Sequence, residues 1–552
     1  MMLGAICERE VLVAPRSRGL YIARAVAAAL LLGIISTCWL VVTGSQAITT
    51  PGDTARFGAT LLRILAPLQL ALAVLTAALV AILAVSVEKD RRTLELLLVS
   101  RLGDAQLVIG KLAGSLLRVG LLLVAAAPMF AIAALFGGVT PPQLLRLFAA
   151  TAAAAIAAAS IGNLAAFWRD TSFQALVITA SALVVWSAAG EAAAATGGRD
   201  VGAMVSPARA ALAALTPAGG RSLPTFLAVC GGLVVATSGL AVAGVRRWNT
   251  AGEPRRRAAT PAARRPRREV WANPVLWREV RTRAHGRAMI VVRLAWLAIF
   301  CAAVAGVAAA ARADRPDRMA VAAAIVPVLL ASLLAVTSLA VTSVTAERDR
   351  GTLDLLLVSD LEPGEFVWGK LLGVLAAARE IVLLPLVLCL ALVPLGIATP
   401  EHGVELLLGL AVLVFFVAVL GVYAGLSHFT SRRAIAVALG IVAFLSIGVA
   451  TAMRIMVAFG GSFELQLAPF LAVIVGGAVG LYATLSARNP SSAVAWTSAL
   501  LPALTFVAIT GFLQGSSLQV LLVVLAGYGF ATLALLVPSI TAFDLLTGRS
   551  GE

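Results

Sequence analysis

Two matched groups of charged residues offer the clearest chemistry in this sequence. Residues 88–100 read Glu-Lys-Asp-Arg-Arg-Thr-Leu-Glu-Leu-Leu-Leu-Val-Ser, and residues 347–359 read Glu-Arg-Asp-Arg-Gly-Thr-Leu-Asp-Leu-Leu-Leu-Val-Ser. The match continues without a gap to a Gly-Lys-Leu in each copy, with 15 identities in the 25 pairs that begin at Glu88 and Glu347. Each copy lies between two long apolar segments, and mixed charges beside a leucine-rich segment are typical of a short amphipathic helix in a polar connection between two spans. We call residues 88–111 and 347–370 the hinges.

Side chains that support catalysis or metal binding are scattered elsewhere in the chain. No pair of cysteines or histidines has the spacing of a disulfide framework or a metal site. The residues concerned are Cys7, Cys38, Cys230, Cys301, Cys389, His285, His402 and His428. We therefore expect no metal, no cofactor and no enzymatic activity in the chain itself.

One segment nearly matches a phosphate-binding loop. Residues 364–371 read Gly-Glu-Phe-Val-Trp-Gly-Lys-Leu, close to the pattern G-x-x-x-x-G-K-[ST]. Leu371 stands where the pattern needs a hydroxyl to bind Mg²⁺, and a membrane span follows instead of a soluble strand and helix. Any ATP-driven activity is therefore expected to draw on an ATPase in a separate partner.

Charged residues inside apolar segments are a further candidate site. Arg118 lies in one predicted span, and Arg379 and Glu380 lie in another. Because charges within a membrane are costly, they commonly face a partner or a cavity. A role in a transport pathway and a role in snorkelling or helix pairing both remain open for these three. Lys111 and Lys370 lie at predicted membrane boundaries, where we expect their stems to snorkel.

The composition indicates the elements that must position these residues. The chain has 552 residues, of which 61% are hydrophobic and only 13% are charged, whereas a soluble protein carries about 25% charged residues. Apolar runs close to the length of about 20 residues needed for a bilayer span recur throughout. We predict an all-α, polytopic membrane helical bundle of about 12–14 transmembrane helices. The net charge of +16 follows the positive-inside bias, so no nucleic-acid partner is expected.

The spans divide into two parallel repeats. We assign residues 1–245 to a first repeat of about six spans, 246–272 to a basic cytoplasmic linker, and 273–552 to a second repeat of six to eight spans. An even number of spans in each repeat places both hinges and both termini in the cytoplasm of a multi-pass protein of the cell membrane, with the basic linker lying against membrane lipids.

Several features of individual spans follow from the same pattern. Residues 197–221 indicate an outer loop, and residues 371–397 a single continuous span. Three apolar runs end the chain where one would match the first repeat: 467–486, 493–513 and 518–540. The spacing of Gly421 with Gly425, and of Gly476 with Gly480, predicts close helix packing.

The hinge segments themselves predict a short amphipathic helix. Leu94, Leu97 and Leu98 recur at intervals of three and four residues and give one apolar face. Glu88 has the spacing of a helical salt bridge with Arg91 and Arg92. A solvated loop is the alternative for any single charge in these segments.

The segment that precedes each set of spans also recurs. Residues 273–280 read Asn-Pro-Val-Leu-Trp-Arg-Glu-Val, and their Arg278, Glu279 and Val280 match Arg9, Glu10 and Val11 near the start of the chain. These two segments are 269 residues apart, whereas the two hinges are 259 residues apart. The difference of ten residues indicates that the first repeat is longer before its hinge.

Taken with the hinge, this order of motifs resembles the ABC-2-type permease family, the membrane subunits of ATP-driven exporters. The resemblance lies in an acidic-basic cluster, then Thr-Leu-acidic-x-Leu-Leu, a serine, and a Gly-Lys that opens the next span. Residues 273–279 are similar to that family's amphipathic elbow. Two units fused in tandem, and two extra spans, depart from the family pattern.

The resemblance implies that each hinge is a coupling helix that touches an ATPase subunit. The positions placed at that contact are Glu88, Asp90, Arg91, Thr93, Leu94, Glu95 and Leu97 in the first hinge, and Glu347, Asp349, Arg350, Thr352, Leu353, Asp354 and Leu356 in the second. It further implies that the chain is the transmembrane permease of an ABC exporter, with an ATPase dimer as partner and an unassigned substrate. The alternatives are a secondary transporter with parallel six-helix repeats and a non-transporting membrane scaffold.

Overall fold

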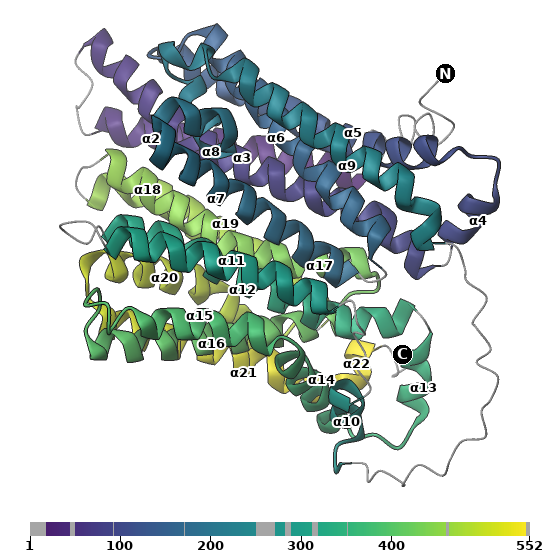
Figure 1. Ribbon diagram of the computed structural model, residues 1–552. Coiled ribbons are helices and arrows are strands. Elements are labelled where there is room, and N and C mark those ends of the chain that lie inside the picture. Colours follow the sequence, from purple (N-terminus) through teal and green to yellow (C-terminus); the bar gives the residue numbers. More distant parts are fainter. Residues whose placement is uncertain are drawn as a thin grey trace.

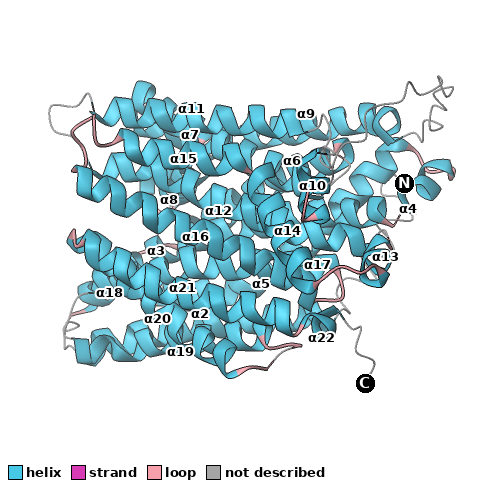
Figure 2. Cartoon of the chain, turned by 90° about the horizontal axis from the view of Figure 1, so that it is seen from below, coloured by secondary structure: helices cyan, strands magenta, loops and turns pink. Residues whose placement is uncertain are grey.

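The computed structural model describes residues 18–44, 50–91, 93–169, 172–249, 271–281, 289–311, 318–349, 351–459, 463–488 and 490–547. Every regular element in these ranges is a helix, and none of them is a strand (Figure 2). A bilayer core supplies no hydrogen-bonding partner, so apolar segments satisfy their backbone groups within helices. The predicted all-α membrane bundle is confirmed.

The first half of the chain forms long helices joined by short turns. Its elements are α2 (Arg18–Gly44), α3 (Pro51–Asp90), α4 (Thr93–Val99), α5 (Asp104–Leu135), α6 (Pro141–Trp168), α7 (Ser172–Val205), α8 (Pro207–Ala214), η1 (Pro217–Gly220) and α9 (Leu223–Asn249). The start of α3 has a local cause. Thr50 and Asp53 form a reciprocal capping box, and Pro51 occupies the first turn, where its missing N–H costs nothing.

The second half repeats this order and then adds helices. Its elements are α10 (Pro274–Arg281), α11 (Met289–Ala311), α12 (Arg318–Asp349), α13 (Thr352–Val358), α14 (Pro363–Ala377), α15 (Arg379–Ala391), α16 (Pro400–Ser427), α17 (Ser431–Ala443), the π-helical turn η2 (Phe444–Gly448), α18 (Val449–Phe459), α19 (Phe463–Leu485), α20 (Ser492–Gln514), α21 (Ser517–Thr541) and α22 (Phe543–Thr547). Thr399 caps α16 through the His402 N–H, and Pro400 follows it, as Pro141 follows Thr140 at α6.

By length and composition, ten helices of the described chain can each cross a membrane, which makes this a multi-pass membrane protein. Helices α14 and α15 form a bent apolar pair whose axes differ by 62°, and counting this pair as one span brings the number to eleven. The described chain also has three shorter apolar helices, Leu20–Ser36, Arg293–Ala308 and Phe470–Leu485, and the last of them lies within the apolar run 467–486.

The same packing pattern occurs in both halves (Figure 1). In the first half α6 packs between α3 and α9, and in the second half α16 packs between α12 and α21. Helix α21 therefore occupies the position that α9 has in the first half. The two additional helices are α19 and α20, which stand in the chain where the first half has only α8 and η1.

The two halves meet along a seam made by corresponding helices. Helix α7 of the first half packs on α11 and α12 of the second, while α18 packs on α2 and α3. The inserted α19 also packs on α2, so it covers one side of this seam. Near one end of the seam Leu83, Val341 and Ile435 belong to one buried apolar cluster.

Glycine packing follows the prediction at one pair and not at the other. A Cβ on Gly421 would lie 2.5 Å from the Cβ of Ala340, and one on Gly425 would lie 3.0 Å from that of Val344. Helices α16 and α12 therefore approach closely, as predicted. A Cβ on Gly476 or Gly480 would meet nothing within 4 Å, so the prediction of close helix packing at that pair is wrong.

Two predicted boundaries are also wrong. The predicted outer loop 197–221 is largely helical, because α7 continues to Val205 through a kink at Gly198, whose φ of 85° favours glycine. The predicted continuous span 371–397 is broken at Ala378 between α14 and α15. Within α15, the Ile381 carbonyl lacks its usual helical partner, because Pro385 four residues later has no N–H. The hydroxyl of Ser332 on α12 donates a hydrogen bond of 2.7 Å to this carbonyl.

Candidate functional site

Both short hinge helices, α4 and α13, lie at the same end of the bundle, beyond the long helices (Figures 1 and 2). One leucine anchors each of them, since Leu94 and Leu353 are both only 3% exposed. A threonine hydroxyl at the start of each hinge helix donates a hydrogen bond back to the end of the preceding long helix. Thr93 donates to the Glu88 carbonyl at 3.2 Å, and Thr352 donates to the Glu347 carbonyl at 3.1 Å. The sequence repeat is thus reproduced at the level of side-chain contacts.

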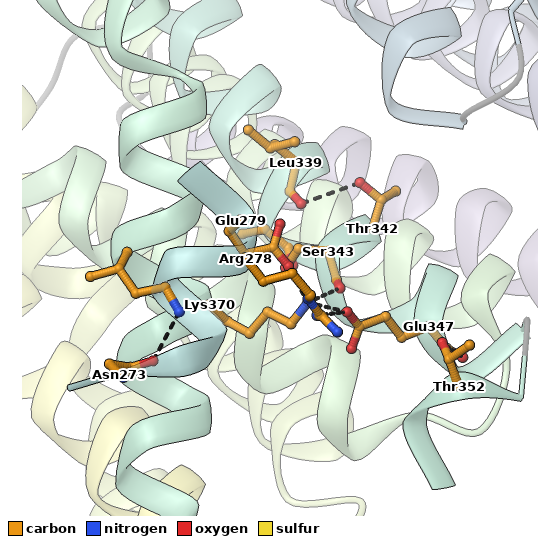
Figure 3. A network of polar contacts seen from close by, with 11 residues as sticks. Asn273, Arg278, Glu279, Leu339, Thr342, Ser343, Glu347, Thr352 and Lys370 are labelled. Carbon is orange, nitrogen blue, oxygen red and sulfur yellow. Dashed lines mark hydrogen bonds and ion pairs between the residues drawn. The ribbon is translucent and has the colours of Figure 1, made fainter. Parts of the chain in front are cut away.

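A buried ion-pair network connects the second hinge to the elbow helix α10 (Figure 3). The Lys370 ammonium lies 2.7 Å from Glu279 Oε1 and 2.7 Å from Glu347 Oε1, and donates to the Ser343 carbonyl at 2.9 Å. Arg278 of α10 pairs with Glu347 as well. The Lys370 side chain is 1% exposed, so the predicted snorkelling of Lys370 is wrong. Burial without these partners would be strongly unfavourable.

The first hinge contains the corresponding pair. Lys111 binds Glu88, and their side chains are 10% and 23% exposed. The predicted pairing of Glu88 with Arg91 is wrong, because Glu88 reaches across the hinge to Lys111 instead. Glu10, which matches Glu279, lies outside the described residues. Glu88 and Glu347 are therefore internal partners of lysines and not part of the outward surface.

A second matched contact ties each hinge to the end of a neighbouring span. Lys89 donates to the carbonyls of Phe167 and Arg169, at 2.7 and 2.9 Å. Arg348 donates to the carbonyls of Leu426 and His428. These carbonyls end α6 and α16, where the helix dipole favours a cation. Each hinge is thereby fixed to the end of one further span, α6 or α16.

The elbow helix packs on two glycines of α14. A Cβ on Gly369 would lie 2.7 Å from the Cβ of Val275, and a Cβ on Gly373 would lie 2.7 Å from the Cβ of Glu279. Since Glu279 is a partner of Lys370, this close approach also sets the geometry of the ion-pair network.

We expect Gly373→Ala to push α10 away from α14 and to lower stability by about 1–3 kcal/mol, the range typical of overpacking. Gly364→Ala in the same helix is the matched control, because a Cβ there meets nothing within 4 Å. Thermal unfolding in detergent would compare the two variants. Equal unfolding temperatures for the variants and the unmodified chain would show that α10 is not held at this position.

The outward surface of each hinge helix is apolar, which the sequence reasoning did not foresee. Leu96 and Leu355 are 72% and 74% exposed, and Val99 and Val358 are 87% and 84% exposed. These four residues occupy matched positions, and we call the two pairs the docking faces. A signal was present, because a helix of seven residues with four leucines and a valine at positions 94–99 has no room to bury all of them.

The remaining predicted hinge residues occupy the margins of the docking faces. Arg91, Thr93, Glu95 and Thr352 are exposed, and Leu97 and Leu356 are half-buried. Asp349 is exposed and accepts a hydrogen bond from the Ser431 hydroxyl. Arg350 and the side chains of Asp90 and Asp354 lie outside what the structure describes.

The predicted pathway residues are not brought together. Arg379 pairs with its neighbour Glu380 at 3.0 Å, and Arg293 of α11 lies 3.3 Å from Glu380. Arg379 is 62% exposed at the outside of the α14–α15 bend. Arg118 of α5 is half-buried and lines a cavity of about 10 Å³ with Lys111. In the described chain these charges therefore line no common cavity.

A small cavity lies between α2, α18 and α19. Its volume is about 20 Å³, and its lining includes Ile34, Cys38 and Met456. A cavity of this size holds about one water molecule.

One buried histidine lies where α16 ends. His428 contacts the Ala424 carbonyl through Nδ1 at 3.2 Å. Burial lowers the pKa of His428, and the nearby positive charges of Arg433, Arg488 and Arg348 lower it further. His428 is therefore neutral at physiological pH and stabilises the turn next to the second hinge without adding charge.

No group of three or more histidine, cysteine or acidic residues in the described chain is placed to hold a metal ion. No family model matches the chain, and no curated protein matches it. The function must therefore be inferred from the two hinges and the bundle that holds them.

Proposed function

We propose that this chain is the membrane permease of an ABC-2-type exporter, with its two repeats forming one transport unit. The observation that carries the proposal is the pair of docking faces. Leu96 with Val99, and Leu355 with Val358, expose apolar side chains at matched positions, at one end of a bundle of membrane-spanning helices. An exposed apolar surface that recurs in this way supports contact with another protein.

The contacts behind the docking faces support a mechanical role. Lys370 ties the second hinge to α10 and α14, and Arg348 ties it to the end of α16. A partner that moves α13 would thus pull on several helices at once. The first hinge has the corresponding contacts to α5 and to the end of α6, through Lys111 and Lys89. This is the connection that a transporter driven by a separate ATPase needs.

We further propose that ATP is hydrolysed by the partner and not by this chain. Lys370, the lysine of the near-match to a phosphate loop, is 1% exposed and bound to two carboxylates. That environment favours a structural role for Lys370 over phosphate binding.

Purification of the tagged chain with and without its partner tests the function. We expect the chain to retain an ATPase that has a complete phosphate-binding loop, and hydrolysis by that ATPase to rise when the chain is present in lipid nanodiscs. The isolated chain should not hydrolyse ATP. Hydrolysis that survives removal of the partner, or transport driven by an ion gradient without any ATPase, would refute the assignment.

The proposal also fixes the orientation, with both hinges on the cytoplasmic side of the cell membrane. In a chain without native cysteines, we expect Ser100→Cys and Ser359→Cys to react with an impermeant thiol reagent only from the cytoplasmic side. Glu401→Cys, exposed at the start of α16, should react only from the other side. Labelling of Ser100→Cys and Ser359→Cys from opposite sides would contradict the parallel arrangement of the repeats.

A further inference from the structure

The two docking faces share an apolar centre but differ in the charges around it. The exposed fractions of Leu96 and Leu355, and of Val99 and Val358, agree within a few per cent. In the flanking sequence, residues 90–110 contain three basic and three acidic residues, whereas residues 349–369 contain one basic and five acidic residues. The second hinge is therefore strongly acidic where the first is balanced.

The difference is sharpest at matched positions on the surface. Arg101 of the first hinge corresponds to Asp360 of the second, and Gly103 corresponds to Glu362; all four are exposed. A reversal of charge at the edge of an otherwise repeated surface changes which partner surface is complementary to it.

Local pairing increases the contrast. In the first hinge, Arg246 of α9 lies 2.5 Å from Asp104 and also donates to the carbonyls of Leu98 and Leu102. This arginine neutralises the carboxylate of Asp104 beside α4. Within the described chain, no ion pair forms at the other hinge to Asp360, Glu362 or Glu365. Their negative charge is left for a partner.

We infer that the second hinge docks on an apolar groove whose rim is basic, and that it carries the salt-sensitive part of ATPase binding. This inference rests on the proposed function. The first hinge docks on the same kind of apolar groove, but without a basic rim. The affinity of the ATPase for the first hinge therefore depends little on salt. Charges at the rim of an interface govern the association rate and the salt dependence, while the buried apolar centre supplies most of the affinity. An anionic lipid surface does not suit the second hinge, because like charges repel.

Chains with a single working hinge would test this inference. Leu96→Asp with Val99→Asp leaves only the second docking face, and Leu355→Asp with Val358→Asp leaves only the first. The probe is the purified ATPase that the unmodified chain retains, titrated onto each variant in nanodiscs. Between about 0.05 and about 0.5 M NaCl, the Debye length, which sets the range of electrostatic attraction, shortens severalfold.

We expect the dissociation constant of the chain with only the second face to rise at least about tenfold more over this salt range than that of the chain with only the first. Asp360→Arg with Glu362→Gln should remove the excess salt dependence, and Arg101→Asp should introduce it at the first face. Equal salt dependence at both faces, or a stronger dependence at the first, would overturn the inference. Failure of the ATPase to bind either single-face chain or the unmodified chain would instead count against the proposed function.

Discussion

Aspartate at all four docking-face positions, Leu96, Val99, Leu355 and Val358, is expected to separate the chain from its ATPase and to abolish ATP-driven transport. A charged side chain at the apolar centre of an interface removes the contacts that supply most of the binding energy. We expect a loss of about 2 kcal/mol or more for each face, which corresponds to at least about a thirtyfold loss of affinity. The bundle should remain folded, because these side chains are 72–87% exposed.

The conservative changes Leu96→Met and Leu355→Met are the matched control, since they keep an apolar surface of similar volume. Retention of the ATPase during purification and transport into vesicles would be measured for both sets. Full transport by the fourfold aspartate variant would remove the docking faces from the account. Loss of transport in the methionine variants as well would show that the helices, and not their apolar faces, are needed.

Removal of the lysine at the centre of the buried network is the second change with a large expected effect. Lys370→Met leaves the carboxylates of Glu279 and Glu347 close together beside Arg278, and breaking a buried ion pair costs about 3–5 kcal/mol. We expect a large fall in unfolding temperature and in the yield of folded protein, with detachment of α10 from the hinge.

The network offers its own controls. Lys111→Met removes the corresponding lysine of the first hinge, but it should cost less, because Glu88 and Lys111 are 23% and 10% exposed whereas Lys370 is 1% exposed. Adding Glu347→Gln to Lys370→Met should recover part of the stability by removing an unpaired charge. Stability equal to that of the unmodified chain in the Lys370→Met variant would mean that the network contributes nothing to holding the hinge.

Local signals in the sequence were sufficient for the membrane fold. Long apolar runs identify the spans, and Thr-Pro pairs such as Thr140-Pro141 mark where matched helices begin. The sequence match between the hinges, at an offset of 259 residues, predicts that they have the same structure. Identical residues at this offset make the same contacts, as Thr93 and Thr352 do. Periodicity also places Leu94 on a buried face.

Features that depend on distant contacts were not predictable in this way. The bend at Ala378 has no proline at that position, and the proline inside α15, Pro385, lies seven residues further on. In the sequence, Lys370 stands at the edge of an apolar run, as a lysine at a membrane boundary does. In the structure it is buried, because α10 packs onto Gly369 and Gly373. The correspondence of α21 with α9 rests on the helices that they pack against, which hydropathy does not reveal.

Site-directed photo-cross-linking from the docking faces would test the central claim most directly. A photoreactive residue would replace Val99 in one chain and Val358 in another, with Leu135, which is 85% exposed at the end of α5 away from the hinge, as the control position. After illumination of native membranes, the account predicts a covalent adduct with the same class of ATPase subunit from both Val99 and Val358 and none from Leu135. Adducts with lipid alone at both hinge positions, while the control behaves identically, would contradict it.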